Sequence, residues 1–231
     1  IVNKKQKVIR MLNYITWTVD PVLFSFGPLS VRWYGLMWAI GFLIGYSVIS
    51  KVYKNEGISE EDTEKLFMYM LVGTVVGARV GDCFFYHWDY YKDHPFDVIK
   101  VWNGGLSSHG GACGILLVLW YYSKNVVKKN FLWVMDRIVL PVAICGACIR
   151  FGNLMNHEIY GHATDVPWAF QFITNIHGWM NGAEPLFSPP SHPTQIYEML
   201  YCLVTFGIVS YLYWKTDVKK HEGFIFGVFL I

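Results

Sequence analysis

The chain has 231 residues, of which 54% are hydrophobic and 18% aromatic, while only 16% carry a charge. Soluble proteins carry about 25% charged residues, so this composition excludes an ordinary soluble domain and predicts an integral membrane protein. The formal net charge of +2 is too small to favour a nucleic-acid partner, and none is expected. The five cysteines fall within apolar stretches, so no disulfide framework is expected either.

Long apolar segments predict an all-α, polytopic fold, starting with two spans. The first covers residues 33–52 and the second residues 66–86, with a polar loop between them. Arg79 and Asp82, three residues apart in the second span, either form an ion pair or line a polar cavity. Residues 87–108 are rich in aromatic and charged side chains, which is typical of an amphipathic segment at the membrane interface.

A third apolar segment, residues 110–122, is short for a membrane span. Its 13 residues make about 20 Å of helix, whereas the bilayer core is about 30 Å thick. Either the preceding glycine-rich turn dips into the membrane or the helix begins below the surface. Both alternatives place His109 near a helix N-terminus and facing a cavity. The flanking glycines leave its ring open to another molecule, so His109 is either a structural histidine or a proton-transfer group.

The remaining chain predicts a fourth span over residues 132–152 and a fifth from about 194 to 214. A sixth apolar run starts at Gly223 and has nine residues when the sequence stops, so we expect a chain cut within a helix. Residues 153–193 are too polar to span and predict a small folded head on the membrane surface. We therefore expect residues 1–231 to form a single membrane domain of about six spans, with the head inserted between the fourth and fifth.

Lysines predict the orientation of these spans. They cluster in the loops near residues 51–65, 124–129 and 215–220, whereas residues 151–214 contain no Lys or Arg. Because cytoplasmic loops carry the excess of basic residues, these three loops are expected in the cytoplasm. The head, His109 and Arg150 are then expected on the outer face. The basic N-terminal residues 4–10 depart from this rule, but they lie some twenty residues before the first span, where the rule weakens.

The fourth apolar segment ends in the polar run 150–158, Arg-Phe-Gly-Asn-Leu-Met-Asn-His-Glu. Unpaired polar groups at membrane depth cost free energy, so a run of them is retained mainly where it has a function. This run therefore predicts a functional site. Arg150 would lie at the depth of lipid phosphates, which a guanidinium binds bidentately. The alternative is that Arg150 reaches water and pairs with Glu158. On a continuing helix, Arg150, Asn153 and His157 would share one face. The other polar candidates expected on the outer side are Tyr34, His109, Asn156, His192, Gln195 and Glu198.

The run Gly146-Ala-Cys-Ile-Arg150-Phe-Gly-Asn153-Leu-Met-Asn156-His-Glu158 resembles the signature of the bacterial prolipoprotein diacylglyceryl transferases. Three further segments are similar to that family in the same order: Arg32-Trp-Tyr34-Gly35, Gly104-Gly-Leu-Ser-Ser-His109-Gly-Gly and His192-Pro-Thr-Gln195-Ile-Tyr-Glu198. The turn from Glu158 to Gly161 resembles the start of the family's head region. The resemblance covers nearly the whole chain.

This resemblance implies a transfer of the diacylglyceryl group from phosphatidylglycerol to the lipobox cysteine of preprolipoproteins, in the bacterial inner membrane, with release of glycerol phosphate. The resemblance also implies seven spans, the last of which lies beyond Ile231, so a molecule ending there is expected to be inactive. No cofactor and no metal are expected, because the sequence has neither an HExxH motif nor an Asp-rich metal motif. A thiol with a pKa of about 8.5 needs a base before it can attack, and a leaving phosphate needs a cation.

By resemblance, the catalytic residues are His109 as candidate base, Arg150 as the phosphatidylglycerol contact, and Tyr34, Asn153 and Glu158. The substrate-binding residues implied are Asn156, Gly161, His192, Gln195 and Glu198. The residues alone leave one alternative, a transporter or channel with Arg79, Asp82 and Arg150 along a polar path.

Overall fold

The computed structural model describes residues 14–27, 29–100 and 105–231. Part of the glycine-rich turn before His109, residues 101–104, therefore lies outside the described residues. The chain divides into two compact units. Unit 1 comprises the chain up to Gly45 together with Pro141–Ser210, and unit 2 comprises Tyr46–Leu140 and Tyr211–Ile231.

Four of the described helices are long and apolar enough to cross a membrane: α2 (Trp33–Asn55), α3 (Glu60–Phe85), α6 (Phe131–Met155) and α8 (Thr194–Lys215). They coincide with the expected first, second, fourth and fifth spans. Helix α3 begins six residues before the expected span because Ser59 caps it, accepting a hydrogen bond from the backbone N–H of Asp62 at 3.1 Å. Three acidic residues in its first turn favour the same start, since they face the positive end of the helix dipole.

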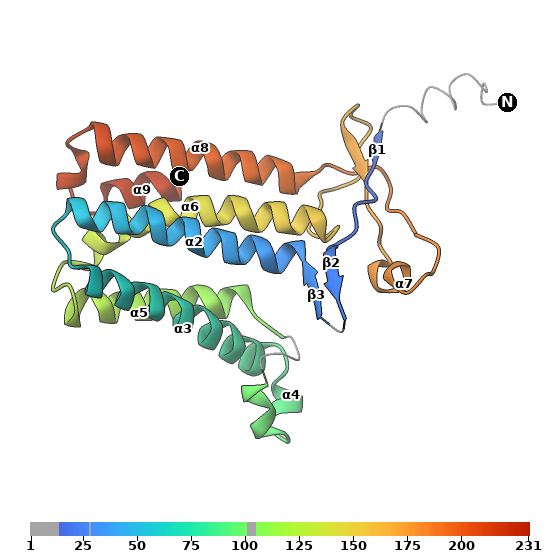
Figure 1. The fold of residues 1–231 in the computed structure, drawn as a ribbon, viewed down its shortest axis with the longest axis horizontal. Coiled ribbons are helices and arrows are strands. Elements are labelled where there is room, and N and C mark those ends of the chain that lie inside the picture. The colour runs from blue at the N-terminus through green and yellow to red at the C-terminus, as the bar shows by residue number, and fades with distance from the viewer. Residues whose placement is uncertain (1–13, 28, 101–104) are drawn as a thin grey trace. The chain divides into compact units, whose positions relative to one another are not determined.

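The expected third span is the helix α5 (Ser108–Asn125), which is longer at both ends than the apolar run. Its 18 residues make about 27 Å of helix. It lies directly beside α3 in unit 2 (Figure 1). The run after Gly223 forms the short helix α9 (Phe224–Leu230). That α5 and α9 belong to membrane spans stays a prediction.

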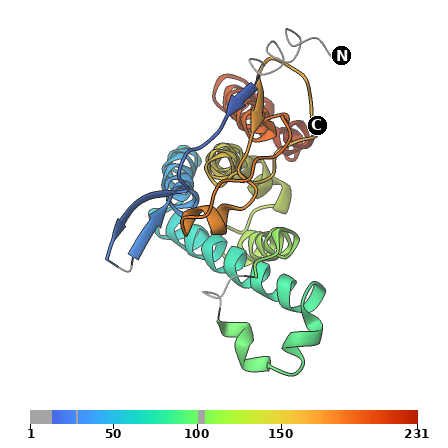
Figure 2. The same ribbon diagram turned by 90° about the vertical axis from the view of Figure 1, so that its right-hand side faces the viewer.

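An all-α fold is not what the structure has, although the chain is mostly helical. Strand β1 (Tyr14–Thr16) pairs in parallel with β4 (Ala169–Gln171), and β2 (Val22–Phe26) pairs antiparallel with β3 (Leu29–Arg32). The β2–β3 segment is rich in Val, Leu and Phe, which favour strands, and Gly27 takes a positive φ of 59° in the turn. The pairing of β1 with β4 is visible in both Figure 1 and Figure 2.

The segments between the long helices contain short helices and irregular chain. Residues 87–100 carry α4 (Trp88–Tyr91) and the 3₁₀ helix η1 (Pro95–Ile99), and a second 3₁₀ helix, η3 (Val218–Lys220), precedes α9. The region expected to form a head contains β4, α7 (Ile176–Met180) and loops. A small hydrophobic core of unit 1 joins this region to the end of α6. Its buried members are Leu154, Phe170 and Phe172, with Trp17, Tyr160 and Ile196 packed against them.

Candidate active site

Arg150 lies in the last turns of α6, with 32% of its side chain exposed. Its Nε lies 2.5 Å from Oε2 of Glu198 on α8, and its Nη1 donates to Oδ1 of Asn153 at 3.3 Å. The alternative pairing of Arg150 with Glu158 is therefore wrong, because Glu198 is the carboxylate at the guanidinium. Among the described residues, Nη2 has no hydrogen-bond partner, so two of its N–H donors remain for a ligand.

Asn153 connects this ion pair to Glu158. Its side chain is buried, and its Nδ2 donates to Oε1 of Glu158 at 2.8 Å while its Oδ1 accepts from Arg150. Asn156 donates to the same Glu158 oxygen at 3.3 Å. Glu198, Arg150, Asn153, Glu158 and Asn156 thus form one continuous network, which we call the Arg150 network. It holds one cation and two carboxylates.

The chain reverses direction after α6, and this reversal brings Glu158 back to Asn153. Helix α6 ends at Met155, His157 and Ile159 both have a positive φ of 57°, and the backbone N–H of Glu158 donates to the carbonyl of Asn153. The expectation that His157 shares a helical face with Arg150 is therefore wrong. The His157 ring is instead buried, with Nδ1 accepting from the backbone N–H of Ile173 at 3.1 Å and Nε2 lying 2.8 Å from the carbonyl oxygen of Val19.

The start of α8 holds this turn in place. Gln195 donates from Nε2 to the backbone oxygen of Glu158 at 2.7 Å, and the backbone N–H of Gly161 donates to the carbonyl of His192. A Cβ on Gly161 would lie 2.7 Å from Cγ2 of Thr194, so only glycine fits there without a shift. Gly161, His192 and Gln195, all predicted from the sequence, therefore meet in one place.

Two buried oxygens beside Glu158, Oδ1 of Asn156 and Oε1 of Gln195, have no hydrogen-bond partner within the described ranges. Buried acceptors are rarely left unpaired, so they mark positions that a water or a substrate hydroxyl can complete.

Tyr34, in the first turn of α2, packs against Gly152 of α6. A Cβ on Gly152 would meet the Tyr34 ring at 2.9 Å, so the glycine lets the two helices approach. Trp168 and Tyr197 have no role predicted from the sequence, and the structure places both at His192. Trp168 donates to the Tyr197 hydroxyl at 2.7 Å, and that hydroxyl lies 3.2 Å from Nδ1 of His192. In the part of the chain that the structure describes, no cluster of three or more His, Cys, Asp or Glu side chains could hold a metal ion.

His109 belongs to unit 2, where it lies in the first turn of α5 as expected from its position after the glycine-rich turn. Ser107 caps this helix by accepting from the backbone N–H of Gly110 at 3.2 Å. The exposed His109 ring has Nδ1 3.3 Å from the Tyr86 hydroxyl. It borders a largely apolar groove of about 770 Å³ lined by α3, α5 and the residues next to them.

Arg79 is buried and donates mainly to backbone carbonyls. Its partners are the oxygens of Asp97 at 2.7 Å, Val98 at 2.9 Å, Lys100 at 3.2 Å and Gly105 at 3.1 Å. The guanidinium thus holds the segment after α4 onto α3, and its donors are used in doing so. Arg79 therefore gives no support to an arginine-lined transport path.

Comparison with known proteins agrees with the sequence motifs. The profile of the family described as prolipoprotein diacylglyceryl transferase matches residues 21–231. A relative from Chloroherpeton thalassium is 44% identical over 218 residues, which cover 94% of this chain and 77% of the relative. A relative from Tolumonas auensis is 41% identical, and the match covers 93% of this chain and 78% of the relative. A relative from Porphyromonas gingivalis is 43% identical, and the match covers 94% of this chain and 77% of the relative. All three are named phosphatidylglycerol–prolipoprotein diacylglyceryl transferase.

Proposed function

Because the chain belongs to the prolipoprotein diacylglyceryl transferase family, we propose that it transfers the diacylglyceryl group of phosphatidylglycerol to the lipobox cysteine of a preprolipoprotein. The observation that carries this proposal is the Arg150 guanidinium. It is held on two sides by Glu198 and Asn153, and its Nη2 donors are unused among the described residues. Such a fixed, partly exposed cation suits a lipid phosphate.

The reaction is a displacement at the glyceryl carbon that bears the phosphate ester. The cysteine sulfur forms a bond to this carbon while the bond from the carbon to the phosphate oxygen breaks, and the electron pair leaves with glycerol phosphate. Arg150 stabilises the negative charge that develops on the leaving phosphate. Glu198 and Asn153 keep the guanidinium oriented, and Glu158 in turn holds the Asn153 amide.

The thiol proton goes to a base, for which His109 is the candidate. In the tautomer in which Nδ1–H donates to the Tyr86 hydroxyl, Nε2 carries the lone pair that accepts the thiol proton. The exposed ring at the start of α5 and the adjoining groove support this assignment. Tyr34, which packs against Gly152 of α6, completes the proposed catalytic group.

The substrate-binding group is proposed around Glu158. The unpaired oxygens of Asn156 and Gln195 would accept hydrogen bonds from the glycerol hydroxyls of the headgroup. Gly161 and His192 shape the adjoining turn, where a side chain at 161 would collide with α8.

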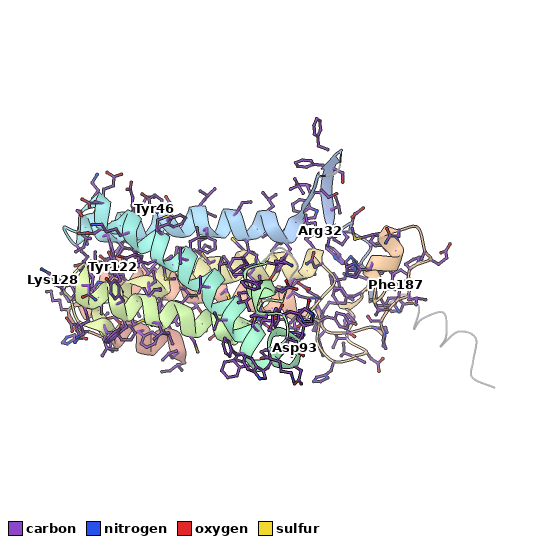
Figure 3. All side chains as sticks on the ribbon, turned by 90° about the horizontal axis from the view of Figure 1, so that it is seen from below. Arg32, Tyr46, Asp93, Tyr122, Lys128 and Phe187 are labelled. Carbon is purple, nitrogen blue, oxygen red and sulfur yellow. The ribbon has the colours of Figure 1, made fainter. Side chains whose placement is uncertain are left out.

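We assign the protein to the bacterial inner membrane as a single multi-pass domain of about six spans. The distribution of lysines supports an outer-face location for the active site and for a head formed by residues 153–193. In unit 2, Lys128 and Tyr122 lie at one end of the α3–α5 pair and Asp93 at the other (Figure 3). The basic loop after α5 and the first turn of α5, with His109, are thus at opposite ends of one helix.

The test uses the full-length protein in phosphatidylglycerol vesicles with a lipobox peptide, and measures a diacylglyceryl mass addition on the peptide cysteine. We expect addition with the unchanged protein and a fall in rate of at least about 100-fold for Arg150→Ala, because a transition-state cation is lost. Lys215→Ala, which removes an exposed cation at the far end of α8, should leave the rate unchanged. No addition by the unchanged protein, or full activity of Arg150→Ala, would contradict the proposal.

A further inference from the structure

The β2–β3 hairpin exposes large apolar side chains without any charge among them. Residues 21–31 contain no charged side chain, and the charged residues Asp20 and Arg32 flank them. Phe26 is 83% exposed and Phe24 is 56% exposed. Exposed apolar surface is unfavourable in water, so a contiguous apolar face of this kind usually has a partner.

The hairpin has an apolar and a polar face. Its register pairs Phe24 with Val31 and Ser25 with Ser30. Residues paired across antiparallel strands share a face, and successive residues alternate between faces. Phe24, Phe26 and Val31 therefore lie on one face. Ser25 and Ser30, whose hydroxyls lie 2.9 Å apart, are on the other face with Arg32.

The hairpin is continuous with a helix of membrane-spanning length. Strand β3 ends at Arg32 and α2 begins at Trp33, whose backbone N–H donates to the carbonyl of Pro21 at 3.0 Å and closes the base of the hairpin. Trp33 and Tyr34 are residue types that gather at the membrane–water interface. Within unit 1, the two strands extend sideways from the start of α2 and not along its axis (Figures 1 and 2).

A ribbon that runs across the axis of a spanning helix, at its interface end, lies along the membrane surface. We propose that the β2–β3 hairpin is a membrane anchor, with the Phe24–Phe26 face inserted among the lipids of the leaflet where α2 begins. Ser25, Ser30 and Arg32 face the headgroups and water. This inference goes beyond the transfer reaction and requires only that α2 crosses the membrane.

Such an anchor has a consequence for the Arg150 network. The hairpin is joined directly to Tyr34, and Tyr34 packs on Gly152, two residues from Arg150. The anchor thereby sets the depth of Arg150 relative to the lipid phosphates.

The experiment places the photoreactive residue p-benzoylphenylalanine at position 24, 25 or 26 of the full chain, in vesicles of phosphatidylglycerol and phosphatidylcholine. After irradiation, intact-mass spectrometry detects protein carrying one phospholipid. We expect this adduct at positions 24 and 26, with a yield several-fold higher than at position 25, the matched control on the opposite face. An unchanged melting temperature checks that each variant folds.

Equal yields at positions 25 and 26, or no lipid adduct at position 26, would overturn the proposal. So would a switch from lipid to peptide adduct at position 26 when a lipobox peptide is added, because the hairpin would then be a peptide-docking surface. The readout does not need turnover, so an Arg150→Ala background should give the same adducts. Failure of the anchor and failure of the transferase proposal are therefore distinguishable.

Discussion

At the scale of single residues, Asn153 has a role that only an amide can fill. It accepts from Arg150 with Oδ1 and donates to Glu158 with Nδ2, in a buried position. An aspartate has the same shape but cannot donate, and it would place a second carboxylate against Glu158.

We therefore expect Asn153→Asp to lose about 1–3 kcal/mol of stability and most of the transferase activity, as the lost hydrogen bond leaves buried groups unpaired. The melting temperature and the rate of diacylglyceryl addition measure the two effects. Asn181→Asp is the control, since that exposed amide donates only to the carbonyl of His177. A variant at 153 with unchanged melting temperature and rate would show that the network does not need the amide.

The sequence predicts this cluster incompletely. Arg150, Asn153, Asn156 and Glu158 are close along the chain, so their grouping follows from the sequence alone. The partner of Arg150 does not, because Glu198 comes from another helix. Helical periodicity predicts a shared face for His157 and Arg150, because it does not reveal that α6 ends at Met155 and that His157 and Ile159 take positive φ values.

At the scale of elements, α3 and α5 pack at glycines. A Cβ on Gly114 would lie 2.2 Å from the carbonyl oxygen of Gly73, and one on Gly77 would lie 2.5 Å from the carbonyl oxygen of Gly110. Small residues of this kind allow close helix contact in membranes.

Gly114→Ala should therefore separate these helices and lower stability by about 1–3 kcal/mol, the usual cost of overpacking. The measurement is the melting temperature of the purified protein. Gly207→Ala on α8 is the matched control, because nothing lies within 4 Å of its added Cβ. It should leave stability unchanged or raise it by about 0.5–1 kcal/mol, the helix preference for alanine over glycine. Equal effects of the two substitutions would argue against glycine-dependent packing.

The long helices are predictable and the strands are not. Each of α2, α3, α6 and α8 carries its own apolar signal over more than twenty residues. The three residues of β1 depend on β4, which lies far along the chain, and so short a segment has no local signal for that pairing.

At the scale of the whole molecule, His157 ties three distant parts of unit 1 together. Its ring lies between the carbonyl of Val19 near the start of the described chain and the backbone N–H of Ile173, next to β4, while its own backbone follows α6. Because Ile173 donates to Nδ1, that nitrogen carries no proton, and Nε2 donates to Val19. The ring is thus held in its neutral form.

Burial lowers the pKa of His157 below the usual value of about 6.5, although the contact with the Val19 carbonyl acts in the opposite direction. The unfolded chain then binds a proton at a pH where the folded protein does not, so acid favours unfolding. We expect full stability above about pH 6.5 and a fall in melting temperature as the pH drops from there toward the folded-state pKa.

The variant His157→Asn should be less stable at neutral pH, but its melting temperature should no longer fall in acid because of this ring. The control His177→Asn, at an exposed position, should keep the acid-dependent fall of the unchanged protein. Melting curves between pH 5 and 7 measure the difference, and identical slopes for the unchanged protein and His157→Asn would contradict the assignment of the neutral ring.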